Sequence, residues 1–362
     1  MYIKSLTLKN FRNYKEQVLE FDPMTNIFCG MNAQGKTNLL EALYLFSMGK
    51  SFRTAQDADL IRFGEEYTKA SLLFCDRNRE HTLEIIILRN KKKQIKINGL
   101  TISRLSELVG NLHVVLFYPE ELGLVKGGPN LRRRFMDVAL SQLRPAYYYT
   151  LGRYQRVVEQ RNKLIKRIRL SGNRSLTDTM FVWNEKLADY GMELVQYRIA
   201  FIERLTKLAQ KAHFEASGEK LELFYRPRFA QKEDFLKKLE NSLEREIEQG
   251  YTLYGPHRED FEIFINEKEA RLFGSQGQQR SAVLSLKLAQ ADLLFEEYNE
   301  YPVLLLDDIM SELDGTRRTY LAGKIPDKQV FITCTEIDAL LGQGRVFTVQ
   351  DGQAEPEQSY GK

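Results

Sequence analysis

The residues whose types and spacing most clearly suggest a chemical role form one short stretch, G-x-x-x-x-G-K-T. Its members are Gly30, Met31, Asn32, Ala33, Gln34, Gly35, Lys36 and Thr37. Glycines let a loop curl until several backbone N–H groups converge on an anion, and a helix that begins there adds its positive end. Lys36 can reach the β and γ phosphates of a nucleotide, and the Thr37 hydroxyl can bind Mg²⁺. The stretch therefore predicts a polyphosphate site.

The flanking residues give this motif the context that it needs. Asn26 to Cys29 is an apolar run typical of a strand, and Asn38 to Phe46 has the pattern of an amphipathic helix. The alternative, a glycine-rich turn with a chance lysine, does not require a strand before it and a helix after it. We therefore expect a strand, a phosphate loop and a helix in succession.

A second candidate lies near the carboxyl end, where the apolar run from Val303 to Leu306 is followed by Asp307 and Asp308. Such a run predicts a buried parallel strand whose carboxyl end faces a ligand. Asp307 can then hold Mg²⁺, directly or through water, and Asp308 can orient or deprotonate the attacking water. Without the phosphate loop, two acids after a strand more often form a solvated turn.

A third candidate is a second anion-binding device, Ser275, Gln276, Gly277 and Gln278, which opens a helix from about Ser281 to Tyr298. One chain rarely needs two such devices for one γ-phosphate. We expect Ser275 and Gly277 of one subunit to close over the nucleotide of another, with ATP joining a two-fold dimer. The open alternative is an ordinary helix cap by Ser275.

Composition places these motifs in a chain of 362 residues that is 43% hydrophobic and 28% charged, as in globular proteins. No long apolar run or secretory leader is evident, so we expect a cytoplasmic protein. Cys29, Cys75 and Cys334 are expected to be reduced core thiols. The net charge is only +4, yet Leu131 to Arg169 holds eleven Lys or Arg against two acids, which favours a polyanionic partner.

The expected architecture is α/β with an inserted lobe. Residues 1–125 contain several strands and a polar turn from Lys9 to Tyr14, and residues 126–250 have a mainly helical pattern. Breakers at 171–173 and 225–229 argue against a continuous heptad arm and for helices too short to form a long coiled coil. Residues 251–362 return to strands that complete the first lobe.

Taken together, the motifs resemble those of ABC-type ATPases: Walker A (30–38, including Asn38), signature (275–280), Walker B (304–308) and D-loop (311–314). With the stretches 9–14, 118–122, 124–129 and 254–258, the set is similar to the RecF family, globular relatives of SMC heads. The resemblance implies an ATPase head built from a mixed β lobe and a phosphate-loop parallel sheet, with a helical lobe inserted. It also implies binding of ATP and double-stranded or gapped DNA, ATP-dependent dimerisation, and action with RecR and RecO to place RecA on gapped DNA.

The same resemblance implies roles for single residues. Arg12 is expected to touch the nucleotide phosphates. Asp308 stands where many ABC ATPases have glutamate, and its shorter reach predicts a weak ATPase that works as a DNA-stimulated switch. Residues 333–335 occupy the switch region without a histidine, and Tyr118 to Glu120 replaces the usual glutamine pattern.

For DNA we expect a basic helix between Arg132 and Arg169 to supply phosphate contacts. The candidate residues are Arg132, Arg133, Arg134, Arg153, Arg156 and Arg161. A solvated basic face is the alternative. Tyr147, Tyr148 and Tyr149 can stack on bases or pack in a core.

Two other classes of protein stay open. A transporter's nucleotide-binding subunit shares the same motifs, but 238 positions separate Thr37 from Ser275, enough for an extra lobe. A small-molecule kinase would not need the signature. Dimerisation that appears only with ATP would separate an ATP-gated DNA clamp of the RecF kind, and the transporter subunit, from the kinase. Hydrolysis stimulated by DNA would separate the DNA clamp from the transporter subunit.

Overall fold

The structure is a computed structural model that describes residues 1–337 and 344–357. Its first sheet has the antiparallel order β2-β1-β4-β5-β6-β7. The strands are β1 (Tyr2–Phe11), β2 (Tyr14–Glu20), β4 (Tyr67–Cys75), β5 (Glu80–Leu88), β6 (Gln94–Ile97) and β7 (Leu100–Ile102). Residues of β5 alternate between buried and more exposed, as expected when only one face of a sheet meets the core.

The turn expected from Lys9 to Tyr14 is shorter than the sequence indicated. Lys9, Asn10 and Phe11 continue β1, and Phe11 pairs with Tyr14. Only Arg12 and Asn13 remain between the two strands. Arg12 has a positive φ of 52°, which allows the chain to reverse over these two residues.

The second sheet has the order β15-β14-β3-β13-β12-β8 and carries the candidate site. Its strands are β3 (Thr25–Cys29), β8 (Val114–Phe117), β12 (Val303–Asp307), β13 (Val330–Cys334), β14 (Arg345–Gln350) and β15 (Gln353–Pro356). All are parallel to their neighbours except β15. Every residue of β12 is buried, as in parallel sheets covered on both faces.

Two hydrophobic cores lie on opposite faces of this parallel sheet. Leu304 and Leu306 of β12 belong to the core shared with the helical region. Leu305 between them belongs to the core shared with the antiparallel sheet. Alternate side chains of one strand therefore join both cores, which fixes the carboxyl edge of the sheet from two sides.

Helices account for most of the remaining chain. They are α1 (Lys36–Met48), α2 (Gly123–Lys126), α3 (Pro129–Leu143), α4 (Pro145–Ser171), α5 (Met180–Ser217), α6 (Lys232–Asn241), α7 (Leu243–Gln249), α8 (Ala270–Phe273), α9 (Gln276–Tyr298), α10 (Ile309–Glu312) and α11 (Gly315–Lys324). Short 3₁₀ turns are η1 (Asp57–Leu60), η2 (Leu105–Glu107), η3 (Pro119–Leu122), η4 (Arg174–Thr179) and η5 (Pro256–Arg258). A small sheet, β11-β10-β9, is made of β9 (Leu221–Tyr225), β10 (Phe261–Ile265) and β11 (Lys268–Glu269).

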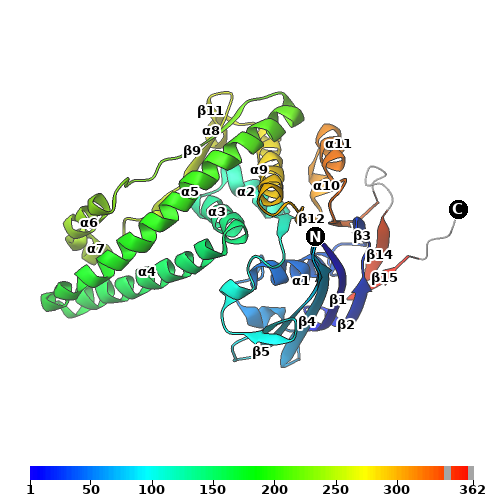
Figure 1. Cartoon of the computed structure of the whole chain (residues 1–362), viewed down its shortest axis with the longest axis horizontal. Coiled ribbons are helices and arrows are strands. Elements are labelled where there is room, and N and C mark those ends of the chain that lie inside the picture. Colours follow the sequence, from blue (N-terminus) through cyan, green and yellow to red (C-terminus); the bar gives the residue numbers. More distant parts are fainter. Residues whose placement is uncertain (338–343, 358–362) are drawn as a thin grey trace.

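Helices α4 and α5 lie side by side and extend away from the two large sheets as an arm (Figure 1). The expectation of short helices was wrong here, because α4 has 27 residues and α5 has 38. At 1.5 Å per residue, α5 spans roughly 57 Å. Gly172, with a φ of 66°, caps α4 at the tip of the arm, where the sequence indicated a break. The second break, at 225–229, begins at the last residue of β9, a strand that the helical pattern concealed.

Candidate nucleotide-binding site

The phosphate loop connects β3 to α1 at the carboxyl edge of the parallel sheet. Gly30 must be glycine because a Cβ there would lie 2.3 Å from the Val349 carbonyl oxygen. Gly35 has a φ of 116°, which L side chains rarely adopt. The Lys36 ammonium donates to the carbonyl oxygens of Gly30 (2.5 Å) and Met31 (2.8 Å), so it lies inside the loop. Lys36 is therefore held where it can meet a phosphate.

The crest of the loop faces outward. Met31, Asn32 and Ala33 are exposed, whereas Gln34 and Gly35 are half-buried. Gln34 is held in place by the segment after β14, because its side-chain oxygen accepts a hydrogen bond from the backbone N–H of Asp351 at 2.7 Å. Three consecutive residues of the motif are thus accessible to a ligand or to another molecule.

The carboxylate at the end of β12 lies beside the helix that follows the loop. The Thr37 hydroxyl donates to Asp307 Oδ1 at 2.9 Å, although 270 residues separate them. Thr333 at the end of β13 donates to the same oxygen at 2.8 Å. Threonine hydroxyl and carboxylate oxygens are the hard ligands that Mg²⁺ prefers, so Thr37 and Asp307 fit that ion together with phosphate oxygens.

Burial affects the Asp307 carboxyl directly. Loss of hydration raises its pKa above the ordinary value, and the hydrogen bonds from Thr333 and Thr37 oppose that rise. A divalent cation would favour the ionised form further. The buried carboxylate is thus placed where a cation would stabilise it.

Asp308 occupies a constrained position directly after β12. Its φ is 51°, and its backbone N–H donates to the Thr333 hydroxyl at 2.8 Å. Thr333 therefore orients both acids at once, a role that sequence reasoning did not assign. The sequence could have indicated this role, because Thr333 lies in the buried strand predicted to follow the Walker B strand.

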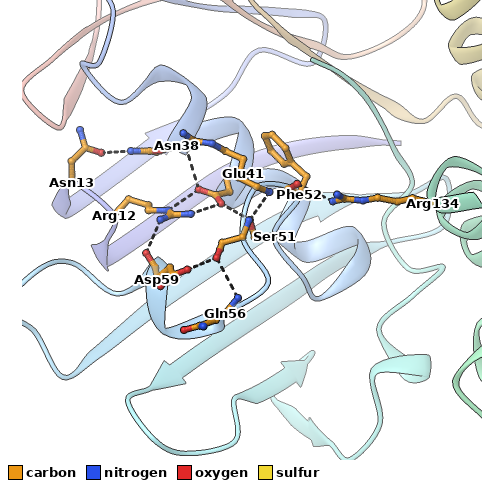
Figure 2. A network of polar contacts seen from close by, with 11 residues as sticks. Arg12, Asn13, Asn38, Glu41, Ser51, Phe52, Gln56, Asp59 and Arg134 are labelled. Atoms are coloured by element: carbon orange, nitrogen blue, oxygen red, sulfur yellow. Dashed lines mark hydrogen bonds and ion pairs between the residues drawn. The ribbon is translucent and has the colours of Figure 1, made fainter. Parts of the chain in front are cut away.

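Beside the loop, the buried Glu41 carboxylate gathers several polar groups (Figure 2). Arg12 donates to its two oxygens at 2.8 Å each, and the Ser51 hydroxyl also donates to it. Glu41 is fully buried, whereas the Arg12 side chain is 21% exposed. Arg12 therefore stands next to the loop in an ion pair, and its contact with phosphate stays a prediction.

Arg53 was missed by the sequence reasoning. Its guanidinium donates to Asn38 Oδ1 at 2.9 Å and lies 3.9 Å from Glu41. Its charge also opposes the burial that raises the pKa of Asp307. An arginine shortly after the helix that follows a phosphate loop was the signal for a second cation at this site.

The signature residues form the N-terminus of α9. Ser275 and Gln278 make a reciprocal capping box: Ser275 Oγ accepts from the Gln278 N–H at 3.2 Å, and Gln278 Oε1 accepts from the Ser275 N–H at 2.9 Å. Ser275 and Gln276 are exposed, and Gly277 packs against Arg317. Among the residues that the structure describes, no hydrogen bond or ion pair joins 275–278 to 30–38. Ser275 is thus a helix cap within one chain, and its exposed face is available to a second copy.

Two of the arginines proposed for DNA are buried, which corrects that prediction. Arg132 is held by Asp260 at 2.9 and 2.7 Å and by backbone carbonyls. Arg161 is fully buried with Glu246 at 2.6 Å. Neither guanidinium is free at the surface, because Arg132 is paired with the partly exposed Asp260 and Arg161 with the fully buried Glu246. The prediction of one basic helix between Arg132 and Arg169 was also wrong, because two helices, α3 and α4, cover this stretch and are separated at Arg144.

The other four arginines line one groove of about 1040 Å³ between the ATPase part and α3–α4. They are Arg133, Arg134, Arg153 and Arg156, and Lys50 and Arg104 come from the opposite side. Arg153 lies 4.3 Å from the centre of the Tyr149 ring. Tyr147, in contrast, is a core residue with 0% exposure.

The fold and these contacts define an ABC-type ATPase head, and residues 2–354 match the family model described as RecF/RecN/SMC N terminal domain. The solved SMC head bound to the C-winged helix domain of ScpA has a TM-score of 0.59 at 16% identity, covering 99% of this chain and 97% of that one, which shows the fold. No helix within 1–337 and 344–357 has both the length and the apolar character needed to cross a membrane.

Within that class, the chain belongs to the RecF family. It is 45% identical to the DNA replication and repair protein RecF of Ruminiclostridium cellulolyticum over 92% of this chain and 93% of that protein. It is 41% identical to that of Clostridium tetani over 98% and 99%. A solved recombination mediator protein RecF with ATP, of the RecFOR pathway, has a TM-score of 0.92 at 38% identity, covering 99% of this chain and 98% of that one. The family and the fold expected from the motifs are confirmed.

Proposed function

We propose that this chain is an ATP-dependent DNA-binding switch in which two copies enclose Mg²⁺-ATP. One observation carries the proposal: a single chain holds a phosphate loop joined to its carboxylate strand and, apart from them, an exposed signature helix end. A relative with 38% identity has been solved with ATP. A second copy, related by a two-fold axis, would supply the missing half of each site.

In this arrangement each residue has a separate task. The loop amides and Lys36 bind the β and γ phosphates, while Thr37 and Asp307 would hold Mg²⁺, which would neutralise charge on the phosphate oxygens. Asp308 accepts a hydrogen bond from the attacking water. Ser275 of the partner subunit donates to the γ-phosphate from the other side.

Slow turnover follows from the position of Asp308. Its carboxylate accepts no hydrogen bond from the described residues, and its backbone is fixed by Thr333. An aspartate also reaches one methylene less far than a glutamate, so water activation is less well aligned. Slow hydrolysis of ATP would then serve to separate the two subunits of the dimer.

The groove and α4 are the proposed DNA site. Arg153, Arg156 and Arg167 lie on one face of α4, are exposed, and have no carboxylate partner in the described part of the chain. They span roughly 21 Å of helix, a length that crosses several phosphates of a duplex. Because such contacts release counterions, affinity should fall steeply with salt and depend little on sequence.

The biological setting comes from the family. The solved relative belongs to the RecFOR pathway, so we propose that this protein acts with RecR and RecO to help place RecA on gapped DNA. The ATP-bound dimer would be the form that stays on DNA, and hydrolysis would release it.

Mixing two inactive variants tests the composite site. Lys36→Met removes the phosphate contact, and Ser275→Arg blocks the opposing face, so neither should dimerise with ATP on its own. A mixture should recover dimers, because a mixed pair contains one site with both residues intact. Sedimentation with and without ATP measures this. Failure of the wild-type protein to dimerise, or no gain on mixing, would contradict the proposal.

DNA binding is tested by charge reversal. Arg153→Glu and Arg156→Glu should each weaken duplex binding, and neutralising one contact should reduce the slope of log affinity against log salt by about 1. Lys237→Glu, an exposed cation on α6 outside the groove, is the control. Equal effects of all three would assign the binding to net charge instead of to this groove.

A further inference from the structure

The signature motif is contacted by a residue that lies outside all the motifs identified in the sequence. Helix α5, the long helix of the arm, ends at Ser217, and Gly218 turns the chain with a φ of 71°. The next residue, Glu219, reaches the first turn of α9. Its Oε1 accepts a hydrogen bond from Gln278 Nε2 at 2.7 Å.

This contact determines how the Gln278 side chain is oriented. The amide oxygen of Gln278 accepts from the Ser275 N–H at 2.9 Å, while its NH₂ group donates to Glu219. An ionised carboxylate can only accept hydrogen bonds, so it selects the orientation that directs the amide oxygen to Ser275. Flipping the amide would lose both bonds. Glu219 therefore stabilises the capping box that fixes Ser275.

The Glu219 carboxylate is itself held in place. Asn266 Nδ2 donates to Oε1 at 3.2 Å, and the buried His213 of α5 lies 4.0 Å from Oε2. The other ring nitrogen of His213 is 3.3 Å from the Ser285 hydroxyl, on the next turns of α9. Polar groups from the base of the arm and from the signature helix thus lie together around Glu219.

We propose that Glu219 is a positioning residue: through Gln278 it holds Ser275 in the orientation that meets the nucleotide of a second copy. This inference rests on the proposed two-copy site. Glu219 does not touch its own chain's phosphate loop, so its loss should weaken ATP-dependent dimerisation and leave nucleotide binding by the single chain unchanged. The base of α5 would then be linked to the nucleotide of the partner subunit.

Three variants separate positioning from general damage. Glu219→Leu removes the acceptor, and Glu219→Gln keeps an acceptor oxygen at nearly the same place. Glu222→Leu is the matched control, because Glu222 is also a partly exposed carboxylate, three residues further on, and its one ion pair among the described residues is with Lys220. The dimerisation constant with ATP is measured by sedimentation. ATP affinity of the single chain is measured in a Ser275→Arg background, which should not dimerise.

We expect Glu219→Leu to weaken the ATP-linked dimer about tenfold, the size expected for a lost hydrogen bond to a charged group. The dimerisation constant of Glu219→Gln should stay within about threefold of the wild-type value, and that of Glu222→Leu should equal the wild-type value. The inference is overturned if Glu219→Leu dimerises normally, if Glu219→Gln is equally defective, or if ATP affinity of the single chain falls as well. Absence of ATP-linked dimers in the wild type would instead reject the two-copy site itself.

Discussion

The buried ion pair in the arm allows the clearest quantitative prediction. Arg161 donates to Asn184 and Thr252 at 2.9 Å each and to Glu246 at 2.6 Å. Both charged side chains are 0% exposed. Arg161→Ala leaves the Glu246 carboxylate buried without its countercharge, which costs about 3–5 kcal/mol in other proteins. Because the Leu253 N–H still donates to Glu246, we expect the lower end, about 3 kcal/mol.

Urea unfolding measures this loss, and a double variant tests its cause. Arg161→Met with Glu246→Leu replaces the pair by apolar groups of similar volume, which is often neutral or stabilising. We therefore expect the double variant to recover most of the lost stability. Arg156→Ala, five residues earlier on the exposed face of α4, should change the free energy of unfolding by less than about 0.5 kcal/mol.

The same variants separate structure from DNA binding. The double variant should bind DNA as the wild type does, whereas Arg156→Ala should bind more weakly. An unchanged midpoint for Arg161→Ala would refute the reasoning about the buried pair. Weak DNA binding by the stable double variant would show that Arg161 serves the DNA site after all.

Other predictions follow from the nucleotide site and from buried histidines. Thr37→Val keeps the shape but removes an oxygen ligand, so Mg²⁺-dependent hydrolysis should fall at least tenfold while ATP binding without Mg²⁺, measured by fluorescence titration, changes little. Glu41→Gln removes the charge that Arg12 faces and should lower the free energy of unfolding by about 1–3 kcal/mol, since Arg12 is partly hydrated; urea midpoints measure it. Burial lowers the pKa of His113 and of His257 to about 4 from 6.5. Their neutral forms are favoured in the folded chain, so the free energy of unfolding is at its full value above pH 6.5. It falls as pH decreases toward 4, by up to about 3 kcal/mol for each histidine. Urea unfolding of the wild type and of His257→Gln at pH 7 and pH 5 should show a smaller decrease in the variant.

The local motifs were predictable because their chemistry lies in consecutive residues. The phosphate loop needs glycines at set positions and a helix directly after it, and Gly30 and Gly35 occupy the crowded and the left-handed positions. The Walker B strand was evident from its continuous apolar run, because a strand buried on both faces has no polar alternation. The structure then brings Asp307 to Thr37, as the motif reasoning required.

The arm was misjudged for a physical reason. Apolar residues of α4 and α5 are shared between packing in the arm and packing on other helices, so their spacing does not follow a regular heptad. Strand β9 is also short, and it is stabilised by pairing with β10, which lies 36 or more residues further along the chain. Periodicity within a window cannot reveal a partner that lies outside it.

The sequence by itself determined that this chain has a phosphate loop, a carboxylate strand and a signature helix, because each depends on the conformation of a few adjacent residues. Only the tertiary structure decided which charged residues are free. Arg132 and Arg161 look like Arg153 and Arg156 in a list of cations, yet they are neutralised by Asp260 and Glu246, 128 and 85 residues away. Burying a charge requires an opposite charge in contact with it, and that contact exists only once the chain has folded.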